Sequence, residues 1–375
     1  MLERTDLMKI KKPDYQNSIL NVSNTFLHHY GINTKYNGVP LLEDALTKDI
    51  NHIVYILLDG LGSNIIKHHL SNEDYLKKYM KSEITSVFPP TTVAATDTVL
   101  SALPPISSGY LGWVQYFYNE DVNAIVFQNK DFYDVGRTLK TNLRDTYLSF
   151  TPITEQIHQK NNNIKTEIFF PSFIEGGSES FTEEIDKVLL TTHNTDQSFS
   201  YLYWTEPDST QHKKGIYSDE THQMIKSLNK DFTQLCEHIT DDTLVVVIAD
   251  HGLIDITEIP LFKYEDITSL FLRQPSIEPR ATNFFIKEGK EDLFKAKFQS
   301  YFQEDYLLYT KEELLSSGLL GEGNQHDMID SFLGQFIAIA ITDKMFTLNT
   351  NSTYKAHHAG LSEGEMMVPL IIYKK

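Results

Sequence analysis

The sequence has only one cysteine, Cys236, among 375 residues. A single cysteine cannot form a disulfide within the chain, and it cannot build a metal site that depends on several thiolates. Cys236 lies beside the apolar stripe of a predicted helix, so we interpret it as a core residue rather than a nucleophile.

Long apolar runs are also missing. No stretch approaches the roughly 20 apolar residues that are needed to cross a bilayer. Residues 1–15, MLERTDLMKIKKPDY, carry charges throughout and have no apolar core of the kind found in an export signal. We therefore expect a soluble, cytoplasmic protein without a membrane partner.

Basic residues are outnumbered by acidic ones. The chain has 33 Lys and Arg against 51 Asp and Glu, which gives a formal net charge of −18. Such a chain repels the phosphates of nucleic acids, so we expect no nucleic acid polymer as a partner. A small anionic substrate is still compatible with this charge if local cations or metals make the electrostatic potential at the site positive. The oligomeric state is not determined by the sequence.

Short apolar runs rich in Val, Ile, Tyr and Phe indicate buried strands, and helical patterns lie between them. The runs alternate little, which is typical of a parallel sheet covered by helices on both faces. The clearest helix is predicted over 219–239, where apolar residues recur at spacings of three and four. Together they predict an α/β fold with a mostly parallel central sheet sandwiched between helices. The predicted strands are 53–58, 166–170, 201–204, 244–248, 283–286, 336–341 and 368–373.

Residues at the carboxyl ends of these strands are candidates for a site, because ligands of such sheets bind there. Asp59 follows the first strand in DGLG, where it is a candidate ligand or a helix cap. Asp250 and His251 end the run VVVIADHGL. An adjacent carboxylate and imidazole are donors that divalent metals use.

Two further stretches carry carboxylates or histidines near predicted strands. In EPDSTQH, Asp208 and His212 are four residues apart, which places both on one face of a helical turn. Such pairs also form ordinary surface hydrogen bonds, so the motif alone is a moderate signal. His357 and His358 precede an acidic stretch and the last strand.

The segment FPPTT places Thr91 and Thr92 where a helix over 93–103 is predicted to begin. A helix N-terminus presents free N–H groups that suit phosphate, and a bound metal can turn a hydroxyl into a nucleophile. A threonine there is equally suited to cap the helix. Both roles are compatible if one threonine caps and the other attacks.

Five motifs in this order resemble the alkaline phosphatase superfamily, and most closely its nucleotide pyrophosphatase/phosphodiesterase (type I phosphodiesterase) group. They are DGLG at 59–62, FPPTT at 88–92, EPDSTQH at 206–212, ADHG at 249–252 and HAGLSEGEMMVPL at 358–370. The resemblance implies an alkaline phosphatase-like catalytic domain over 1–258 and 344–375. It also implies an inserted α+β cap over 259–343 that selects the substrate.

The resemblance also implies a site for two divalent metal ions, with zinc expected and manganese as the alternative. By similarity, one ion would be bound by Asp59, Thr92, Asp250 and His251, and the other by Asp208, His212 and His358. Thr92 is preferred to Thr91 by its register against the family's later Gly and Pro, which fall here on Ala102 and Pro105. His358 is preferred to His357 because HAG matches the family's HGG.

The activity implied is hydrolysis of a small phosphate ester, with Thr92 as nucleophile and a phosphothreonine intermediate. No Arg stands beside Thr92, which favours a diester or pyrophosphate over a monoester. Val93 and Ala95 replace the family's base-stacking aromatic residue and phosphate-binding Asn, which disfavours a nucleotide. The alternatives are a phosphomonoesterase of the same superfamily and a non-catalytic metal- or phosphate-binding scaffold.

A second inserted region, 109–145, is rich in aromatic residues, as in GYLGWVQYFY. We expect it to form a packed satellite core, because aromatic stripes usually pack. The alternative is a hydrophobic wall over the leaving group of the substrate.

Overall fold

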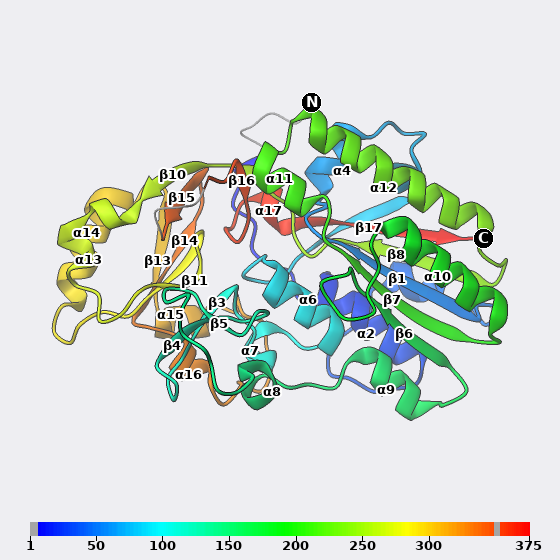
Figure 1. Ribbon diagram of the computed structural model, residues 1–375, viewed down its shortest axis with the longest axis horizontal. Helices are drawn as coiled ribbons and strands as arrows, with labels where there is room; N and C mark the ends of the chain where they lie inside the picture. The colour runs from blue at the N-terminus through cyan, green and yellow to red at the C-terminus, as the bar shows by residue number, and fades with distance from the viewer. Residues whose placement is uncertain (1–6, 349–352) are drawn as a thin grey trace.

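The computed structural model describes residues 7–348 and 353–375. Residues 1–6, which formed part of the argument against an export signal, lie outside the described residues. The two larger β-sheets of the described residues lie side by side, each with its own helices (Figure 1).

The first sheet has six strands in the order β2-β17-β8-β1-β7-β6. Its four strands β8, β1, β7 and β6 are parallel, whereas β17 runs antiparallel to both β8 and β2. This is the mostly parallel central sheet that the sequence predicts. The strands are β1 (His52–Leu58), β2 (Met80–Thr85), β6 (Lys165–Phe169), β7 (Ser198–Trp204), β8 (Thr243–Ile248) and β17 (Met367–Lys374).

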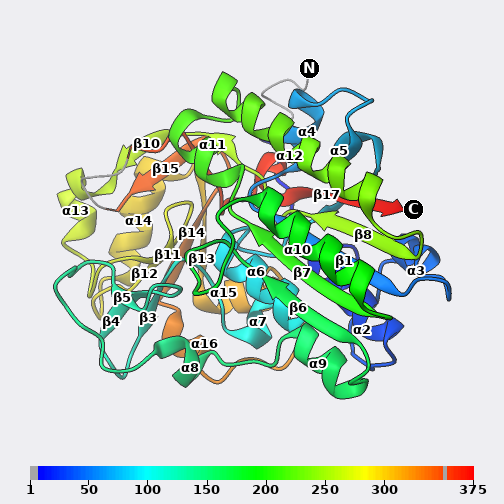
Figure 2. The same ribbon diagram turned by 45° about the vertical axis from the view of Figure 1, so that its right-hand side comes forward.

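Helices cover both faces of this sheet, with α10 and α12 on one side and α2, α6 and α9 on the other (Figure 2). The predicted helix over 219–239 is α12, and its stripe from Ile225 to Leu235 is buried together with Cys236. The helices of this part of the chain are α2 (Ile19–His29), α3 (Pro40–Ala45), α4 (Ser63–His69), α5 (Tyr75–Lys78), α6 (Thr92–Ser101), α7 (Pro105–Ser108), α8 (Leu143–Tyr147), α9 (Ile153–Lys160), α10 (Phe181–Asn194), α11 (Asp208–Lys214), α12 (Asp219–His238) and α17 (Glu363–Met366).

The second sheet is antiparallel, with seven strands in the order β13-β14-β12-β11-β3-β4-β5. It joins two segments that are distant in sequence, since β11 pairs with β3. The strands are β3 (Val114–Phe117), β4 (Val122–Ile125), β5 (Lys130–Asp131), β11 (Ser276–Glu278), β12 (Ala281–Phe284), β13 (Tyr306–Thr310) and β14 (Phe336–Ala340). The segment predicted as a cap, 259–343, therefore shares its sheet with part of the aromatic region 109–145.

Two expected strands, 283–286 and 336–341, fall in this second sheet as β12 and β14 rather than in the parallel one. Their sequences resemble those of parallel strands because β12 and β14 are buried on both faces of the second sheet. One face packs against the phenylalanines of α14 (Glu291–Phe302), and the other packs against a cluster that includes Leu314 and Phe332. A strand covered on both sides is apolar without alternation in either kind of sheet.

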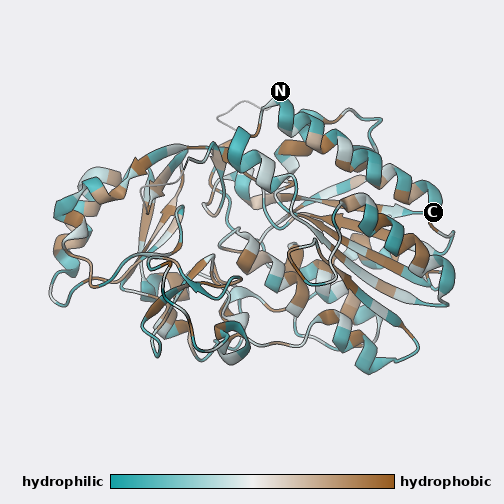
Figure 3. Cartoon of the chain, in the orientation of Figure 1, coloured by the Kyte–Doolittle hydropathy of each residue, from teal (hydrophilic) through white to brown (hydrophobic). Residues whose placement is uncertain are grey.

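Smaller elements complete the fold. Two two-stranded ribbons pair β10 (Thr257–Pro260) with β15 (Lys344–Thr347) and β9 (Ile254–Asp255) with β16 (Ala356–His357). The remaining helices are the 3₁₀ turn η1 (Leu261–Lys263), α13 (Glu265–Thr268), α15 (Lys311–Ser316) and α16 (Ile329–Phe332). In Figure 3, much of the brown, apolar colour lies along the strands of the two larger sheets. A search of the described helices finds none long and apolar enough to cross a membrane.

Candidate active site

The carboxyl ends of three neighbouring parallel strands bring three aspartates to one edge of the first sheet. β1 lies between β7 and β8, in register with both. Asp59 directly follows β1, Asp250 follows β8, and Asp208 begins α11 after β7. The backbone fixes their spacing, since the N–H of Asp208 donates to the carbonyl oxygen of Asp59 at 3.0 Å.

Four predicted site residues form the first group. The Thr92 hydroxyl lies 3.4 Å from Asp59 Oδ2 and 3.3 Å from His251 Nε2. The same His251 nitrogen lies 3.5 Å from Asp59 Oδ1 and 3.4 Å from Asp250 Oδ2. The hydroxyl of Thr92 and one nitrogen of His251 thus face two carboxylates across a space of a few ångströms.

The other three predicted residues form the second group, which adjoins the first. Asp208 Oδ1 lies 3.2 Å from His212 Nε2 and 4.0 Å from His358 Nε2. The rings of His358 and His251 stack with centroids 3.7 Å apart. Ligand atoms of Asp208, His212 and His358 lie within 4.8 Å of one another, and so do those of Asp59, Asp208 and His251. Asp208 therefore stands between the two groups.

Each of the three histidines is held by its Nδ1 atom. His212 Nδ1 lies 2.8 Å from the carbonyl oxygen of Ala356, and His358 Nδ1 lies 3.2 Å from that of Pro90. His251 Nδ1 lies 3.2 Å from the carbonyl oxygen of Gly252. A carbonyl oxygen only accepts, so each of these contacts suits a proton on Nδ1, and Nε2 is the atom directed toward the carboxylates. That is the orientation of a metal-ligating histidine.

Asp59 and Asp250 are buried and Asp208 is partly buried, and two of the three have unused oxygens. Asp250 Oδ2 and Asp208 Oδ1 are buried without a hydrogen bond. Burial, and then the charges of Asp250 and Asp208, hold the pKa of Asp59 well above its usual range. Burial likewise raises the pKa of Asp250, whereas in Asp208 the effect of burial is outweighed by His212, which lowers the pKa. Carboxylates crowded in this way are stabilised by divalent cations, so the residues fit the metal site that the family implies.

A close backbone approach at Gly60 allows this crowding. Gly60 has a φ of +72°, which favours glycine, and a Cβ there would lie 2.8 Å from Asp208 Cβ. The Gly60 N–H also donates to Asp250 Oδ1 at 3.0 Å. Gly60, the first glycine of the DGLG motif, is therefore needed to bring the end of β1 close to Asp208 and Asp250, which follow the neighbouring strands β7 and β8.

The two threonines of FPPTT have different partners. Thr91 precedes α6 as its N-cap residue, but its side chain makes no capping bond. Its hydroxyl donates instead to Glu278 Oε1 at 2.6 Å. Thr92 is the first residue of α6, and its hydroxyl faces Asp59 and His251. The helix begins and ends slightly earlier than the predicted 93–103.

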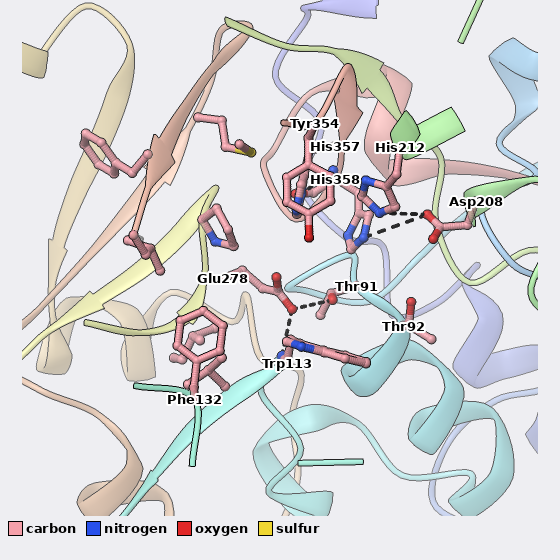
Figure 4. Close-up of a pocket in the computed structure, with 16 residues that line it drawn as sticks. Thr91, Thr92, Trp113, Phe132, Asp208, His212, Glu278, Tyr354, His357 and His358 are labelled. Carbon is pink, nitrogen blue, oxygen red and sulfur yellow. Dashed lines mark hydrogen bonds and ion pairs between the residues drawn. The ribbon is translucent and has the colours of Figure 1, made fainter. Parts of the chain in front are cut away.

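A cavity of about 370 Å³ adjoins these groups and extends toward the second sheet. Its walls combine residues of the first sheet's loops, such as His212 and His358, with residues of both inserted segments (Figure 4). Neither Lys nor Arg lines it within the described ranges. From the aromatic region 109–145, Trp113 and Phe132 reach the cavity, whereas Tyr110 and Phe117 pack into the core as expected.

Sequence reasoning missed Tyr203 and Glu278 at this site, and it set His357 aside in favour of His358. The hydroxyl of Tyr203 donates to Asp59 Oδ2, and only the aromatic character of β7 hinted at it. Burial raises the pKa of Glu278, which lines the cavity, to about 7, although bonds from Thr91 and Trp113 oppose the shift. His357 also lines the cavity, and its Nδ1 accepts the backbone N–H of His358 at 2.9 Å. No motif marked Glu278, because it reaches the site only through tertiary structure.

Part of the chain is similar in sequence to two mammalian proteins. Ectonucleotide pyrophosphatase/phosphodiesterase family member 7 from Rattus norvegicus is 31% identical over 98 residues, covering 22% of this chain and 22% of that protein. The Homo sapiens protein is 30% identical over 98 residues, covering 22% and 21%. The match thus spans about a fifth of the length of these curated relatives.

Solved structures show the same fold. Murine ectonucleotide pyrophosphatase/phosphodiesterase 5 matches with a TM-score of 0.66 and 17% identity, over 85% of this chain and 87% of that one. The human protein of that name matches with a TM-score of 0.63 and 16% identity, over 86% and 87%. A family model described as type I phosphodiesterase/nucleotide pyrophosphatase matches residues 53–315. Because that model spans more than half of the chain, the protein belongs to the type I phosphodiesterase/nucleotide pyrophosphatase family.

Proposed function

We propose that the chain is a metal-dependent phosphodiesterase that uses Thr92 as its nucleophile. The observation that carries the proposal is the position of the Thr92 hydroxyl, 3.4 Å from Asp59 and 3.3 Å from His251 at the floor of a cavity. A hydroxyl kept free of capping at the first residue of a helix is available for attack. In support, one related structure is of an inactive murine variant in which a threonine is replaced by alanine, in complex with AMP.

The metal-binding roles are assigned from the two groups. Asp59, Thr92, Asp250 and His251 would hold one divalent ion, and Asp208, His212 and His358 would hold the other. Zinc is the proposed ion and manganese the alternative, because both accept carboxylate and imidazole ligands. When bound, such ions lower the pKa of a hydroxyl and offset the charge of the transferring phosphoryl group.

The chain's own residues account for the remaining steps. Thr92 Oγ1 attacks phosphorus and gives up its proton, and the bond from phosphorus to one ester oxygen breaks as a phosphothreonine ester forms. The displaced alkoxide takes up a proton and leaves as an alcohol. The N–H groups at the start of α6 are oriented to donate to the phosphoryl oxygens. Water then cleaves the phosphothreonine bond, which releases the product and restores the threonine hydroxyl.

The cavity favours a singly charged ester over a doubly charged one. Neither Lys nor Arg lines it in the described parts of the chain, and it contains the carboxylate of Glu278. A phosphomonoester brings a second negative charge that nothing in this wall offsets. A phosphodiester has a second organic group in place of that second charge, and this group can occupy the cavity.

The test is a paired assay of the metal-reconstituted protein on bis(p-nitrophenyl) phosphate and p-nitrophenyl phosphate. We expect kcat/KM for the diester to exceed that for the monoester by at least about tenfold. Chelation should abolish turnover, and added zinc or manganese should restore it. A preference for the monoester would move the protein to the phosphatase branch. Absence of turnover on either ester, with two metal ions bound, would support a binding scaffold instead.

A further inference from the structure

Two histidines away from the active site bring their ring nitrogens together. His69 is the last residue of α4, and His222 lies near the start of α12. The two helices pack against each other (Figures 1 and 2), and the Nδ1 atoms of the two rings lie 3.4 Å apart. Neither residue belongs to the two groups assigned above to metal ions, and neither lines the cavity.

The ring of His69 is fixed by its other nitrogen. His69 Nε2 lies 2.7 Å from the carbonyl oxygen of Ile216, a contact that suits a proton on Nε2 and leaves the lone pair on Nδ1. His69 is buried, and this burial lowers its pKa, which favours the neutral ring. A carbonyl oxygen that orients one nitrogen of a histidine, while the other nitrogen faces a second ligand, is the usual support of a metal-ligating ring.

The separation of the two nitrogens fits a shared ion better than a hydrogen bond. N–H donors usually lie about 2.7–3.2 Å from their acceptors, and the two Nδ1 atoms are further apart than that. Zinc binds histidine nitrogen at about 2.0–2.1 Å, so two nitrogens on one tetrahedral ion stand about 3.3–3.4 Å apart. His69 Nδ1 and His222 Nδ1 already have this spacing.

Water has to supply the rest of the coordination. His222 is exposed, so an ion between the two rings is open to solvent on one side. In the described segments, no third His, Cys, Asp or Glu completes the pair as one does in each active-site group. His68 packs its ring edge-to-face against Tyr217, with centroids 4.7 Å apart. With two protein ligands, this pair binds an ion more weakly than the active-site groups do.

We propose that His69 and His222 bind a zinc ion through their Nδ1 atoms and that this ion joins α4 to α12. Imidazole nitrogen is a donor that zinc accepts readily. The helix α4 follows the DGLG motif of Asp59, and α12 follows α11, which carries Asp208 and His212. The ion therefore connects two segments that each continue into the active site. The proposal does not depend on the proposed function.

The first test is a calorimetric zinc titration of protein dialysed against a dilute zinc buffer, which fills the tighter sites beforehand. Wild type should take up about one further ion per chain. His222→Ala should bind that ion at least about tenfold more weakly, because it loses a ligand. The control His238→Ala removes another exposed histidine of α12 and should match wild type. Only differences between the proteins are compared, so the number of ions in the active site does not affect the result.

The second test separates an ion from a hydrogen bond between the rings. Thermal unfolding is followed at low and at high zinc. A ligand of the folded state stabilises it in proportion to its occupancy, so zinc should raise the Tm of wild type and of His238→Ala by more than that of His222→Ala. Because His222 is exposed, the variant should fold.

Three results would overturn the site. They are no further uptake of zinc by wild type, equal affinity for the further ion in wild type and His222→Ala, and a difference in Tm that does not change with zinc. The last result would leave a hydrogen bond as the contact between the rings. Neither test measures turnover, so a failure here leaves the phosphodiesterase proposal standing, and a failure of that proposal leaves this one standing.

Discussion

The hydroxyl of Thr91 donates a 2.6 Å hydrogen bond to the carboxylate of Glu278, a residue 187 positions further along the chain. The bond ties the loop that carries Thr92 to the antiparallel sheet of the inserted segments. Because Thr92 directly follows Thr91 in the chain, the bond also links the proposed nucleophile to the cavity wall that Glu278 forms.

Thr91→Val should therefore destabilise the protein without removing its chemistry. The substitution keeps the shape of the side chain but leaves a buried carboxylate with one hydrogen bond fewer, at a cost of about 1–3 kcal/mol in the free energy of unfolding. Urea unfolding measures this change. Thr91→Ser keeps the hydroxyl and should lie close to wild type, and equal stability of Thr91→Val and wild type would show that the bond is unimportant.

Substitutions in the two metal-binding groups should differ in how many ions they release. Asp208 belongs to the second group, but its carboxylate also lies within 4.8 Å of ligand atoms of Asp59 and His251 in the first, whereas His212 is clustered with the second group alone. Asp208→Ala should therefore reduce bound zinc below one ion per chain, and His212→Ala should leave about one.

The metal content is measured by elemental analysis after dialysis against a dilute zinc buffer. The control is His238→Ala, which changes an exposed histidine at the end of α12. It should retain the wild-type metal content. Two ions per chain in Asp208→Ala would contradict the assigned ligands.

Loss of the buried Arg280 side chain should destabilise the fold strongly. Besides its ion pair with Glu365, Arg280 donates to the carbonyl oxygens of Thr342 and Lys344 at 2.9 and 2.6 Å. Glu365 also accepts the N–H of Gly360 at 2.7 Å, close to His358. Arg280→Met leaves the Glu365 charge buried and unpaired, which should cost about 3–5 kcal/mol.

Chemical unfolding of Arg280→Met can be compared with that of Lys297→Met. Lys297 pairs with Asp266 at the surface, where solvent screens the charges, so its loss should cost far less stability than the loss of Arg280. Similar losses in the two variants would mean that the buried pair contributes no more than a surface pair.

The buried Asp97 should make stability depend on pH. Burial raises its pKa from 3.8 to about 7, although Arg144 opposes the shift from 3.6 Å away. The folded chain therefore keeps a proton that the unfolded chain releases at lower pH, so this residue's contribution to stability falls as pH rises between those values.

Asp97→Asn removes that titration. The variant should gain stability relative to wild type as pH rises, and the gain at pH 8 should exceed that at pH 5 by roughly 1–3 kcal/mol. Unfolding at the two pH values measures it. A difference between the two proteins that does not change with pH would show that Asp97 is not protonated in the fold.

The meeting of the three candidate aspartates could be predicted from the sequence because a parallel sheet imposes it, whereas the full set of seven candidate residues came from the resemblance. Asp59, Asp208 and Asp250 each follow a strand, and neighbouring parallel strands end at the same edge. Recognising strands was therefore enough to predict that these carboxylates meet. The choice of Thr92 rested on the resemblance, and the geometry now supplies an independent reason, since Thr91 is engaged elsewhere.

The inserted segments could not be predicted in the same way. The strands β12 and β14 are apolar on both faces, so their sequences do not distinguish an antiparallel from a parallel sheet. The pairing of β11 with β3 joins residues more than a hundred positions apart, and no local pattern reports it. Glu278 reaches the cavity through that pairing, which is why it went unnoticed. The boundaries of the cap, 259–343, remain a prediction.

The most direct test of the account is the turnover of bis(p-nitrophenyl) phosphate by Thr92→Ala beside Thr91→Val, each with its metal content measured. If Thr92 is the nucleophile, Thr92→Ala should lose at least about a thousandfold in kcat, while Thr91→Val loses no more than about tenfold. Turnover of Thr92→Ala at the wild-type rate would contradict the account, whatever metals the protein binds.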